Sequence, residues 1–346
     1  MRAVRYDRFG ESPVVCQVDD PQCPVDGAII EVAATGLCRS DWHGWMGHDP
    51  DIRLPHVPGH EFAGTVVQLG DRVSGWRVGQ RVTVPFVCAC GSCPQCRRGD
   101  HQVCSRQTQP GFSGWGSFAE RVGIDHADVN LVELPDQMPF AIAAALGCRF
   151  ATAYRAVIAH ARPAAGDWLA VHGCGGVGLS AIMVAAAHDV RTVAVDVADE
   201  ALRLAQRIGA TVTVRDEEGV DVVSAIREVT HGGVHASIDA LGSAKTCRNS
   251  IGCLRPRGRH VQVGLFGSDR TDVPMGDVIS RELEVYGSHG MAAHDYPQLL
   301  DEITSGRLRP QDLIGDIIGL DDIPAALAAM TNASPVGVSI IKLSDR

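Results

Sequence analysis

Two residues that commonly bind zinc, Cys38 and His60, lie close together in a segment rich in polar side chains. A cysteine thiolate and a histidine imidazole are both preferred zinc donors. Asp41 could accept a hydrogen bond from His60 and fix its tautomer, as carboxylates beside metal-bound histidines do. Ser40 has a hydroxyl small enough to pass a proton, and His43 is the nearby group that titrates near neutrality. The segment could therefore hold zinc and move a proton.

The same polar residues also have a purely structural interpretation. Ser40, Asp41 and His43 could form an ordinary capped turn into a helix, which is the commoner fate of such a cluster taken alone. The preceding cysteine, together with the triplet Gly-His-Glu at 59–61, reverses that preference. Glu61 could stand beside the metal or exchange with a ligand or water on it.

A second group of cysteines occupies residues 88–104, and four of them have the spacing CxxCxxC with a fourth farther on: Cys90, Cys93, Cys96 and Cys104. Four thiolates suffice for a closed tetrahedral zinc site, which stabilises its loop and performs no chemistry. A bacterial ferredoxin cluster shares the first three cysteines, but its fourth normally comes sooner and precedes proline, whereas Ser105 follows here. A nucleic-acid-binding zinc module is disfavoured by the net charge of −10. Cys88 remains as a spare thiol.

The residue pattern changes at 166–178, where GDWLAVHGCGGVG runs from a short apolar strand into glycines and then into a segment with helical spacing. The glycine-rich motif GxGxxG consists of Gly173, Gly175 and Gly178, with Gly176 and Val177 inside it. A second apolar strand, RTVAVD, ends in Asp196. This context indicates a dinucleotide site: the glycines let the backbone approach the pyrophosphate at the helix N-terminus, and Asp196 can bind the ribose hydroxyls.

Asp196 also predicts which nicotinamide cofactor binds. A carboxylate at this position would repel the 2′-phosphate of NADP. The residues that follow, VADE, offer no arginine or lysine that could bind that phosphate. NAD is therefore favoured over NADP.

The surrounding elements can be predicted from periodicity. Glycines alternate with β-branched residues over 64–84, which suits a compact, strongly turned β-barrel. Residues 138–158 have the pattern of a helix, a turn and a helix, with Cys148 in the turn. Strands and helices alternate after residue 166, which predicts a doubly wound parallel sheet and an α/β fold class. From about residue 290 the sequence predicts one helix and a final strand.

Length and composition limit the class of protein. A chain of 346 residues that is 45% apolar can bury two cores and is expected to form two domains. No apolar run approaches the roughly 20 residues of a membrane helix, and the N-terminus MRAVRYDRFG has no apolar signal region, so we expect a cytoplasmic protein. The acidic net charge argues against nucleic-acid and membrane partners. The 12 cysteines then indicate reduced thiols and metal ligation before disulfides.

Three patterns occur in one order: the segment at 36–64, the cysteine group at 88–104 and the glycines at 166–178. In this the chain resembles the zinc-dependent medium-chain alcohol dehydrogenases over essentially its whole length. The resemblance implies a GroES-like β-barrel catalytic domain with a structural zinc lobe at 1–150 and a Rossmann NAD-binding domain at 151–288. Residues 289–346 would return to the catalytic domain. It also implies two zinc ions per chain and a homo-oligomer, a tetramer or a dimer.

The resemblance assigns a catalytic zinc site. Cys148, in the context CxxxTxY, would be the third ligand after Cys38 and His60, which leaves a fourth position open for a substrate oxygen. Glu61 would lie beside or on this metal. Zinc would lower the pKa of the alcohol, as it does that of water.

The resemblance also assigns residues to the cofactor and the proton. Ser40 and His43 would relay the alcohol proton, while Arg39 would contact the cofactor pyrophosphate. Many relatives carry a second basic residue near the last strand, but ASPVGVSII has none. The remaining residues near cofactor and substrate would be Thr152, Leu265 and Phe86.

The implied activity is reversible oxidation of a primary or secondary alcohol, aromatic ones included, to an aldehyde or ketone with NAD. A polyol or amino-alcohol dehydrogenase of the sorbitol or threonine type would share every motif. A zincless quinone reductase would usually lack the cysteine lobe, and a non-catalytic relic would have lost ligands that this chain keeps. The aromatic residues that could line a pocket for a small-molecule substrate, or simply pack in the core, are Trp42, Trp45, Phe86 and Trp115.

Overall fold

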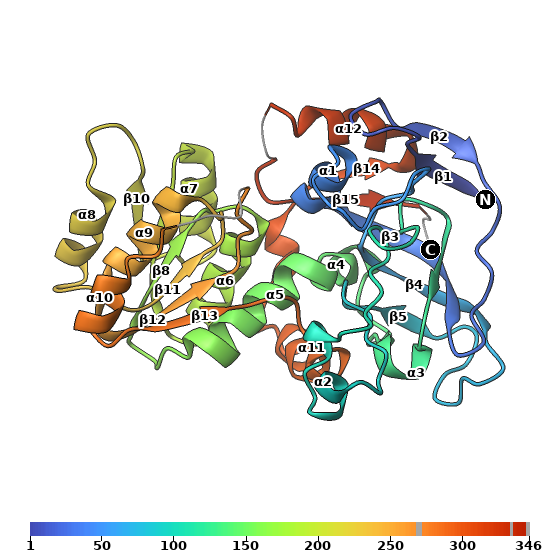
Figure 1. The fold of residues 1–346 in the computed structure, drawn as a ribbon, viewed down its shortest axis with the longest axis horizontal. Helices are drawn as coiled ribbons and strands as arrows, with labels where there is room; N and C mark the ends of the chain where they lie inside the picture. Colours follow the sequence, from blue (N-terminus) through green and yellow to red (C-terminus); the bar gives the residue numbers. More distant parts are fainter. Residues whose placement is uncertain (268–271, 333–334, 344–346) are drawn as a thin grey trace. The chain divides into compact units, whose positions relative to one another are not determined.

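The computed structural model describes residues 1–267, 272–332 and 335–343. The chain forms two compact units (Figure 1). Unit 1 comprises Met1–Ala151, Gly290–Ser305 and Ile314–Arg346, and unit 2 comprises Thr152–His289 and Gly306–Leu313. The expected returning segment 289–346 is thus divided, because the 3₁₀ turn Pro310–Leu313 packs on helix α6 (Gly176–Ala187) of unit 2.

Unit 1 is built on a seven-stranded sheet, in which six strands follow the order β14-β15-β3-β4-β5-β7 and the seventh, β6, pairs with β3. Its strands are β3 (Ala28–Leu37), β4 (Glu61–Leu69), β5 (Arg81–Thr83), β6 (Arg121–Ile124), β7 (Val132–Glu133), β14 (Ile314–Gly319) and β15 (Val338–Lys342). A separate antiparallel pair joins β1 (Arg2–Arg5) to β2 (Val14–Gln17). Strand β3 is almost wholly buried and long enough to pair with β6 along its first half and with β15 along its second. The predicted GroES-like barrel is confirmed.

The helices of unit 1 are short: α1 (Arg39–Trp45), α2 (Pro94–Arg97), α3 (Ala127–Asn130), α4 (Phe140–Ala144), α11 (Tyr296–Thr304) and α12 (Ile323–Ala329). Helix α12 packs against α1, and their apolar side chains join one core with the end of β3. Sequence periodicity predicted α11 and β15 but missed α12 and β14, which are brief and lie between them.

The helical path around Cys148 differs from the expected helix, turn and helix. Helix α4 continues through a π-helical turn, Leu146–Phe150, into α5 (Ala151–Arg155) and a second π-helical turn, Ala156–Ala161. A π turn carries one extra residue per turn and is frequent at functional sites. The predicted break is therefore wrong: Cys148 lies in a widened turn of a continuing helical path.

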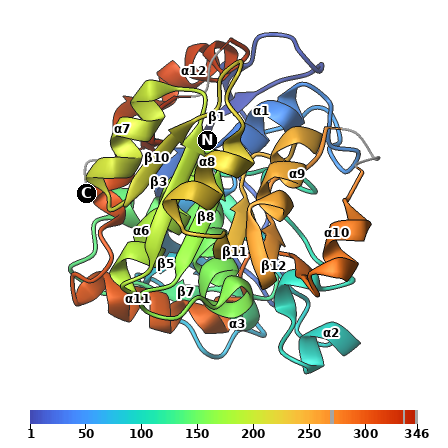
Figure 2. The same ribbon diagram turned by 90° about the vertical axis from the view of Figure 1, so that its left-hand side faces the viewer.

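Unit 2 is a six-stranded parallel sheet in the order β10-β9-β8-β11-β12-β13. Its strands are β8 (Trp168–His172), β9 (Arg191–Asp196), β10 (Val212–Arg215), β11 (Val234–Asp239), β12 (Leu254–Gln262) and β13 (Glu284–Gly287). Its helices are α6 (Gly176–Ala187), α7 (Asp199–Arg207), α8 (Val222–Val229), α9 (Ala244–Gly252) and α10 (Met275–Ser280), and Figure 2 shows them on both faces of the sheet. The doubly wound fold is confirmed. Strand order reverses between β8 and β11, where such folds bind ligands at the strands' carboxyl ends.

Candidate metal and cofactor sites

Strand register brings Cys38 and His60 together. Gly36 on β3 pairs with Glu61 on β4. Cys38 directly follows β3 and His60 directly precedes β4, so both lie at the same end of this antiparallel pair. Their closeness in space therefore follows from the pairing of two strong strands.

Four potential ligand atoms converge at this end of the sheet. The thiols of Cys38 and Cys148, a ring nitrogen of His60 and a carboxylate oxygen of Glu61 all lie within 4.8 Å of one another. The π turn that carries Cys148 is held by the hydrogen bond from the Phe86 amide to the carbonyl of residue 147, 3.1 Å long. The structure thus brings together the residues that the sequence predicted.

The outer partner of His60 is Asp41, as predicted. The imidazole Nδ1 lies 2.9 Å from Asp41 Oδ1. The same carboxylate accepts hydrogen bonds from the backbone amides of Cys38 (2.9 Å) and Gly59 (3.1 Å). Gly59 has φ of +100°, and a Cβ there would lie 2.5 Å from Phe118. Only glycine suits this position, because that backbone conformation and that spacing both exclude a side chain.

His60 also supplies a test of whether zinc fits. Its side chain is buried, and its Nε2 has no hydrogen-bond partner among the described residues. A buried ring nitrogen without a partner is costly unless something binds it. With Nδ1 held by Asp41, the free Nε2 faces the two thiols, and this donor set of one imidazole and two sulfurs is one that zinc prefers.

The two thiols are electrostatically unequal. A hydrogen bond with Cys148 lowers the pKa of Cys38 well below its ordinary value, and nearby Arg149 acts in the same direction. The pKa of Cys148 is raised by the same pairing. Because the thiolate is the form that binds metal, the charge around Cys38 favours ligation.

The predicted polar residues of α1 lie around this set. The Ser40 hydroxyl is 3.7 Å from the Cys38 sulfur. The Arg39 guanidinium lies over the Trp42 ring, 3.9 Å from its centroid, and donates to the carbonyl of Met330. This second contact ties α1 to the end of α12.

His43 has a neighbour that the sequence analysis missed. Its Nδ1 lies 3.0 Å from Nδ1 of His48, and the Trp42 ring packs edge-on against both imidazoles. The backbone amide of His48 donates to the carbonyl of His43, which closes the turn after α1. No sequence motif predicted the contact between the His43 and His48 rings.

Arg149 is the other residue that sequence reasoning missed. Its buried side chain forms an ion pair with Glu61, beside the predicted ligands. Nothing in the sequence around Cys148 marks the arginine, since it follows a ligand without a recognisable spacing to Glu61.

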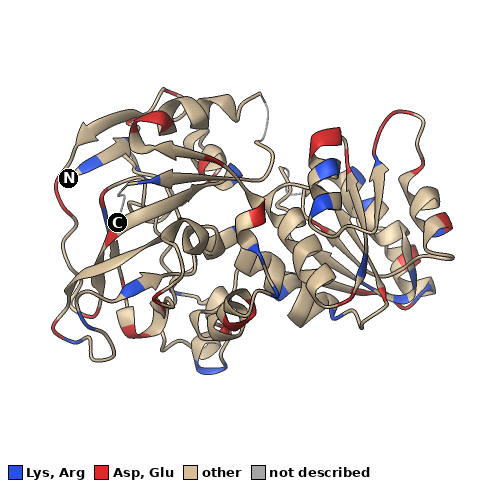
Figure 3. Cartoon of the chain, turned by 180° about the vertical axis from the view of Figure 1, so that it is seen from behind, with Lys and Arg blue, Asp and Glu red and all other residues tan. Residues whose placement is uncertain are grey.

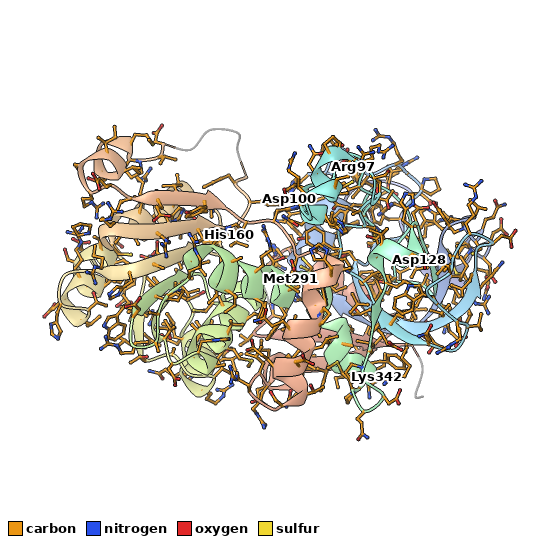
Figure 4. All side chains as sticks on the ribbon, turned by 90° about the horizontal axis from the view of Figure 1, so that it is seen from below. Arg97, Asp100, Asp128, His160, Met291 and Lys342 are labelled. Atoms are coloured by element: carbon orange, nitrogen blue, oxygen red, sulfur yellow. The ribbon has the colours of Figure 1, made fainter. Side chains whose placement is uncertain are left out.

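The cysteine lobe assembles as predicted. The sulfurs of Cys90, Cys93, Cys96 and Cys104 lie within 4.8 Å of one another. The sulfur–sulfur distance is 3.4 Å between Cys93 and Cys96, 3.7 Å between Cys93 and Cys104, and 4.0 Å between Cys90 and Cys96. A tetrahedron with zinc–sulfur bonds of about 2.3 Å has edges of about 3.8 Å, so zinc fits. Figure 4 marks the lobe by Arg97, at the end of α2, and Asp100.

Hydrogen bonds to sulfur support these four thiols. The amide of Cys90 and the amide of Arg106 each donate to Cys104, both at 3.3 Å, and the Arg106 guanidinium donates to Cys90 at 3.3 Å. Cys88 lies outside the cluster and is buried against the carbonyl of Pro85. Burial raises the pKa of this spare thiol, which packs in the hydrophobic core of unit 1.

In unit 2 the glycine-rich motif forms the turn from β8 into α6. Gly173 has φ of +92°, and a Cβ at Gly178 would lie 1.8 Å from the carbonyl oxygen of Gly173. The first glycine therefore permits the turn and the third permits close packing of helix on strand. Gly175 is the N-cap of α6, and Gly176 and Val177 are its first residues, so their amides lie at the helix N-terminus, where an anionic pyrophosphate fits.

Asp196 ends β9 beside this turn. Its carboxylate accepts hydrogen bonds from the backbone amides of Cys174 (2.6 Å) and Ala198 (2.9 Å), and these two bonds fix the orientation of the carboxylate. Arg215 is its register partner on β10, a cation that the sequence pattern did not reveal. The guanidinium is already paired with Asp199 (3.2 Å) and Glu217 (3.4 Å), so this edge keeps an excess of negative charge.

The remaining predicted residues have mixed placements. The buried hydroxyl of Thr152 has no hydrogen-bond partner within the described part of the chain, and Leu265, 81% exposed, follows β12. Phe86 lies 6.3 Å from the His60 ring, between centroids. Trp45 packs in the core with α12, which is the packing role that the sequence had left open for it, whereas Trp115 is 39% exposed.

Figure 3 shows Lys and Arg interspersed with Asp and Glu on both units. Across the described ranges, no helix is long and apolar enough to cross a bilayer.

Two domain families match the sequence. The Alcohol dehydrogenase GroES-like domain covers residues 25–136, and the Zinc-binding dehydrogenase domain covers residues 176–305. An alcohol dehydrogenase of Geobacillus stearothermophilus is 30% identical over 93% of this chain and 95% of that protein.

Solved structures of dehydrogenases have the same fold as this chain. The alcohol dehydrogenase TADH from Thermus sp. ATN1 has a TM-score of 0.92 and 29% identity, covering 99% of this chain and 100% of that one. A zinc-binding dehydrogenase from Sinorhizobium meliloti 1021, solved with NADP bound, has a TM-score of 0.88 and 28% identity over 99% and 98%. The chain therefore belongs to the zinc-type medium-chain alcohol dehydrogenase family and is an oxidoreductase.

Proposed function

We propose that the protein oxidises primary or secondary alcohols, aromatic ones included, reversibly to aldehydes or ketones with NAD. One observation carries this proposal: the donor atoms of Cys38, His60 and Cys148 converge, and the buried Nε2 of His60 among them has no hydrogen-bond partner in the described part of the chain. Unit 1 would hold the metal and the alcohol, and unit 2 would bind the cofactor.

Zinc at this site, held by Cys38, His60 and Cys148, would supply a Lewis acid that lowers the pKa of the alcohol hydroxyl. Asp41 keeps the His60 ring in the orientation that ligation needs. Ser40 accepts the hydroxyl proton, and His43 releases it to solvent. By the family resemblance, Arg39 would contact the cofactor pyrophosphate, Thr152 would lie near the nicotinamide, and Phe86 and Leu265 would contribute to binding substrate and cofactor.

The environment of His43 predicts a pH profile. Burial lowers its pKa, and the positive charges of Arg39 and His48 lower it further. His43 accepts a proton only when neutral, so the rate of alcohol oxidation should rise with pH through an apparent pKa lower than that of an ordinary histidine. We expect His48→Gln, which removes a like charge, to raise the pKa of His43 and so to move the rise in rate to higher pH. We expect His43→Gln to abolish this rise. The measurement is kcat for alcohol oxidation against pH; identical profiles in all three proteins would exclude His43 from proton release.

The edge around Asp196 predicts the choice of cofactor. A hydrogen bond to a charged group contributes about 1.5–3 kcal/mol, so Asp196→Ala should raise KM for NAD about ten-fold or more. It should also permit NADP, because Arg215 would then face the 2′-phosphate with less competing negative charge. In the double variant with Arg215→Gln the gain in NADP use should disappear. Steady-state kinetics with both cofactors decide, and an unchanged NAD to NADP ratio in Asp196→Ala would remove Asp196 from this role.

The geometry of the lobe supports a second, structural zinc on Cys90, Cys93, Cys96 and Cys104, hence two zinc ions per chain. We also propose a cytoplasmic location and a homo-oligomeric assembly, a tetramer or a dimer, on the family resemblance.

The experiment for the function is a substrate panel. Purified protein is given NAD, and separately NADP, with short primary, secondary, aromatic and polyhydroxy alcohols, and NADH or NADPH formation is followed. The proposal expects NAD-linked turnover of simple or aromatic alcohols. Turnover confined to polyols or amino alcohols would move the assignment to that substrate class, and no turnover in protein with both zinc sites filled would contradict the proposal.

A further inference from the structure

The carboxylate of Glu61 is held by one residue through three hydrogen bonds. The Arg149 backbone amide and Nε donate to Oε1, at 2.9 and 3.0 Å, and Nη2 donates to Oε2. Both side chains are buried, at 8% and 0% exposure. Arginine can form this planar two-pronged contact with a carboxylate, whereas lysine cannot.

The fold makes room for this pair. Gly36, the register partner of Glu61 on β3, has no side chain in the way. A Cβ at Gly36 would lie 2.5 Å from Glu61 Oε2 and 3.0 Å from Arg149 Nη2. The pair thus occupies a space that a larger residue on β3 would fill.

A buried ion pair of this kind needs an explanation other than stability. Removing two charges from water costs several kcal/mol per ion, and well-packed apolar residues often serve stability as well or better. The pair lies directly beside the donor atoms of Cys38, His60 and Cys148. Its position therefore points to a role at the metal centre.

Charge counting shows what that role is. The thiolates of Cys38 and Cys148 balance the two charges of zinc when His60 is neutral, so Glu61 would add an unbalanced negative charge. Arg149 cancels it. Both lone pairs of Oε1 are used by Arg149, and Oε2 accepts a further N–H, so the carboxylate is largely committed to the arginine.

We infer that Arg149 is a positioning residue that keeps Glu61 off the metal, so that the fourth ligand position stays open for the alcohol. The inference rests on the proposed zinc-dependent alcohol oxidation. Without the guanidinium, a carboxylate this close to the other donors would occupy that position and compete with substrate.

The test uses cobalt-substituted protein, because the visible spectrum of cobalt(II) reports the number and type of its ligands. Arg149→Met removes the guanidinium and keeps the backbone donor. We expect an altered cobalt spectrum in the absence of alcohol, a raised KM for alcohol and a loss of about 10–100-fold in kcat/KM with zinc, the usual scale for outer partners of metal ligands. The double variant Arg149→Met/Glu61→Gln should regain the wild-type cobalt spectrum, because no carboxylate remains to bind.

An unchanged cobalt spectrum in Arg149→Met would overturn the inference. The double variant also covers the case in which Arg149→Met does not fold, since the double variant leaves no unpaired buried charge. An altered spectrum in the double variant would then count against the inference. Absence of alcohol oxidation in the wild-type zinc protein would instead refute the proposed function, because the spectra do not depend on turnover.

Discussion

Replacing Cys38 with alanine is expected to lower alcohol turnover by about 10³-fold or more and to leave NADH binding nearly unchanged. Lewis-acid stabilisation by a metal contributes several kcal/mol to catalysis, and each 1.4 kcal/mol is about ten-fold in rate. Cys38 is one of three proposed ligands and has a lowered pKa, so the variant would lose a thiolate that is proposed to bind the metal. The glycine-rich turn and Asp196 belong to unit 2, which has its own core, so the cofactor site should survive.

Three measurements check this prediction: zinc per chain, NADH affinity by fluorescence titration, and steady-state turnover. Zinc should fall from two ions per chain to one. Cys16→Ala is the matched control, because Cys16 lies on β2, away from both groups of ligands, and should keep full activity and both metals. Turnover retained in Cys38→Ala would refute the assignment of the catalytic metal site.

Replacing Cys96 with alanine is expected to destabilise the cysteine lobe while the remaining protein keeps its catalytic metal. Structural zinc contributes about 10–16 kcal/mol to folding in isolated zinc peptides. Apolar packing adds little to the lobe: its cluster of buried residues, within the described ranges, consists of cysteines and Ala89, with Val129 packed beside them. Loss of one thiolate should therefore loosen residues 88–106 and lower the melting temperature.

Limited proteolysis and thermal unfolding measure this effect, and the zinc content per chain is measured on the same samples. New cleavage should fall within 88–106. Cys88→Ala is the control, since this buried thiol is outside the cluster: it should cost about 1 kcal/mol for lost packing and release no zinc. If Cys96→Ala retained two zinc ions and wild-type protease resistance, the structural zinc assignment would be wrong.

Both metal groups were predictable from sequence for different reasons. The lobe is local, so spacing alone identifies Cys90, Cys93, Cys96 and Cys104. Cys38 and His60 are separated by a loop, yet they flank two strands, β3 and β4, whose apolar pattern is strong enough to predict and whose pairing leaves little freedom in where their ends meet.

Residues brought together by tertiary structure alone were not predictable. Arg149 reaches Glu61 because a π turn redirects the chain after α4, and a sequence pattern does not reveal that extra residue. Arg215 lies beside Asp196 only because β10 pairs with β9 in parallel. The contact between His43 and His48 depends on the loop after α1.

The missed elements β14 and α12 have a similar cause. Strand β14 lies next to β15 at the edge of the unit 1 sheet, and its exposed Ile317 obscures the alternation that marks a half-buried strand. Helix α12 is two turns long, with Ile323 and Leu327 as its buried face. Segments this short acquire their structure from the core that they cover.

The most direct test of zinc-dependent alcohol oxidation is NADH formation from NAD and alcohol by the same protein before and after removal and return of zinc. Turnover should vanish when a chelator takes the ion from Cys38, His60 and Cys148, and stoichiometric zinc should restore it. NADH formation at an undiminished rate in protein shown by metal analysis to hold no zinc would contradict the account.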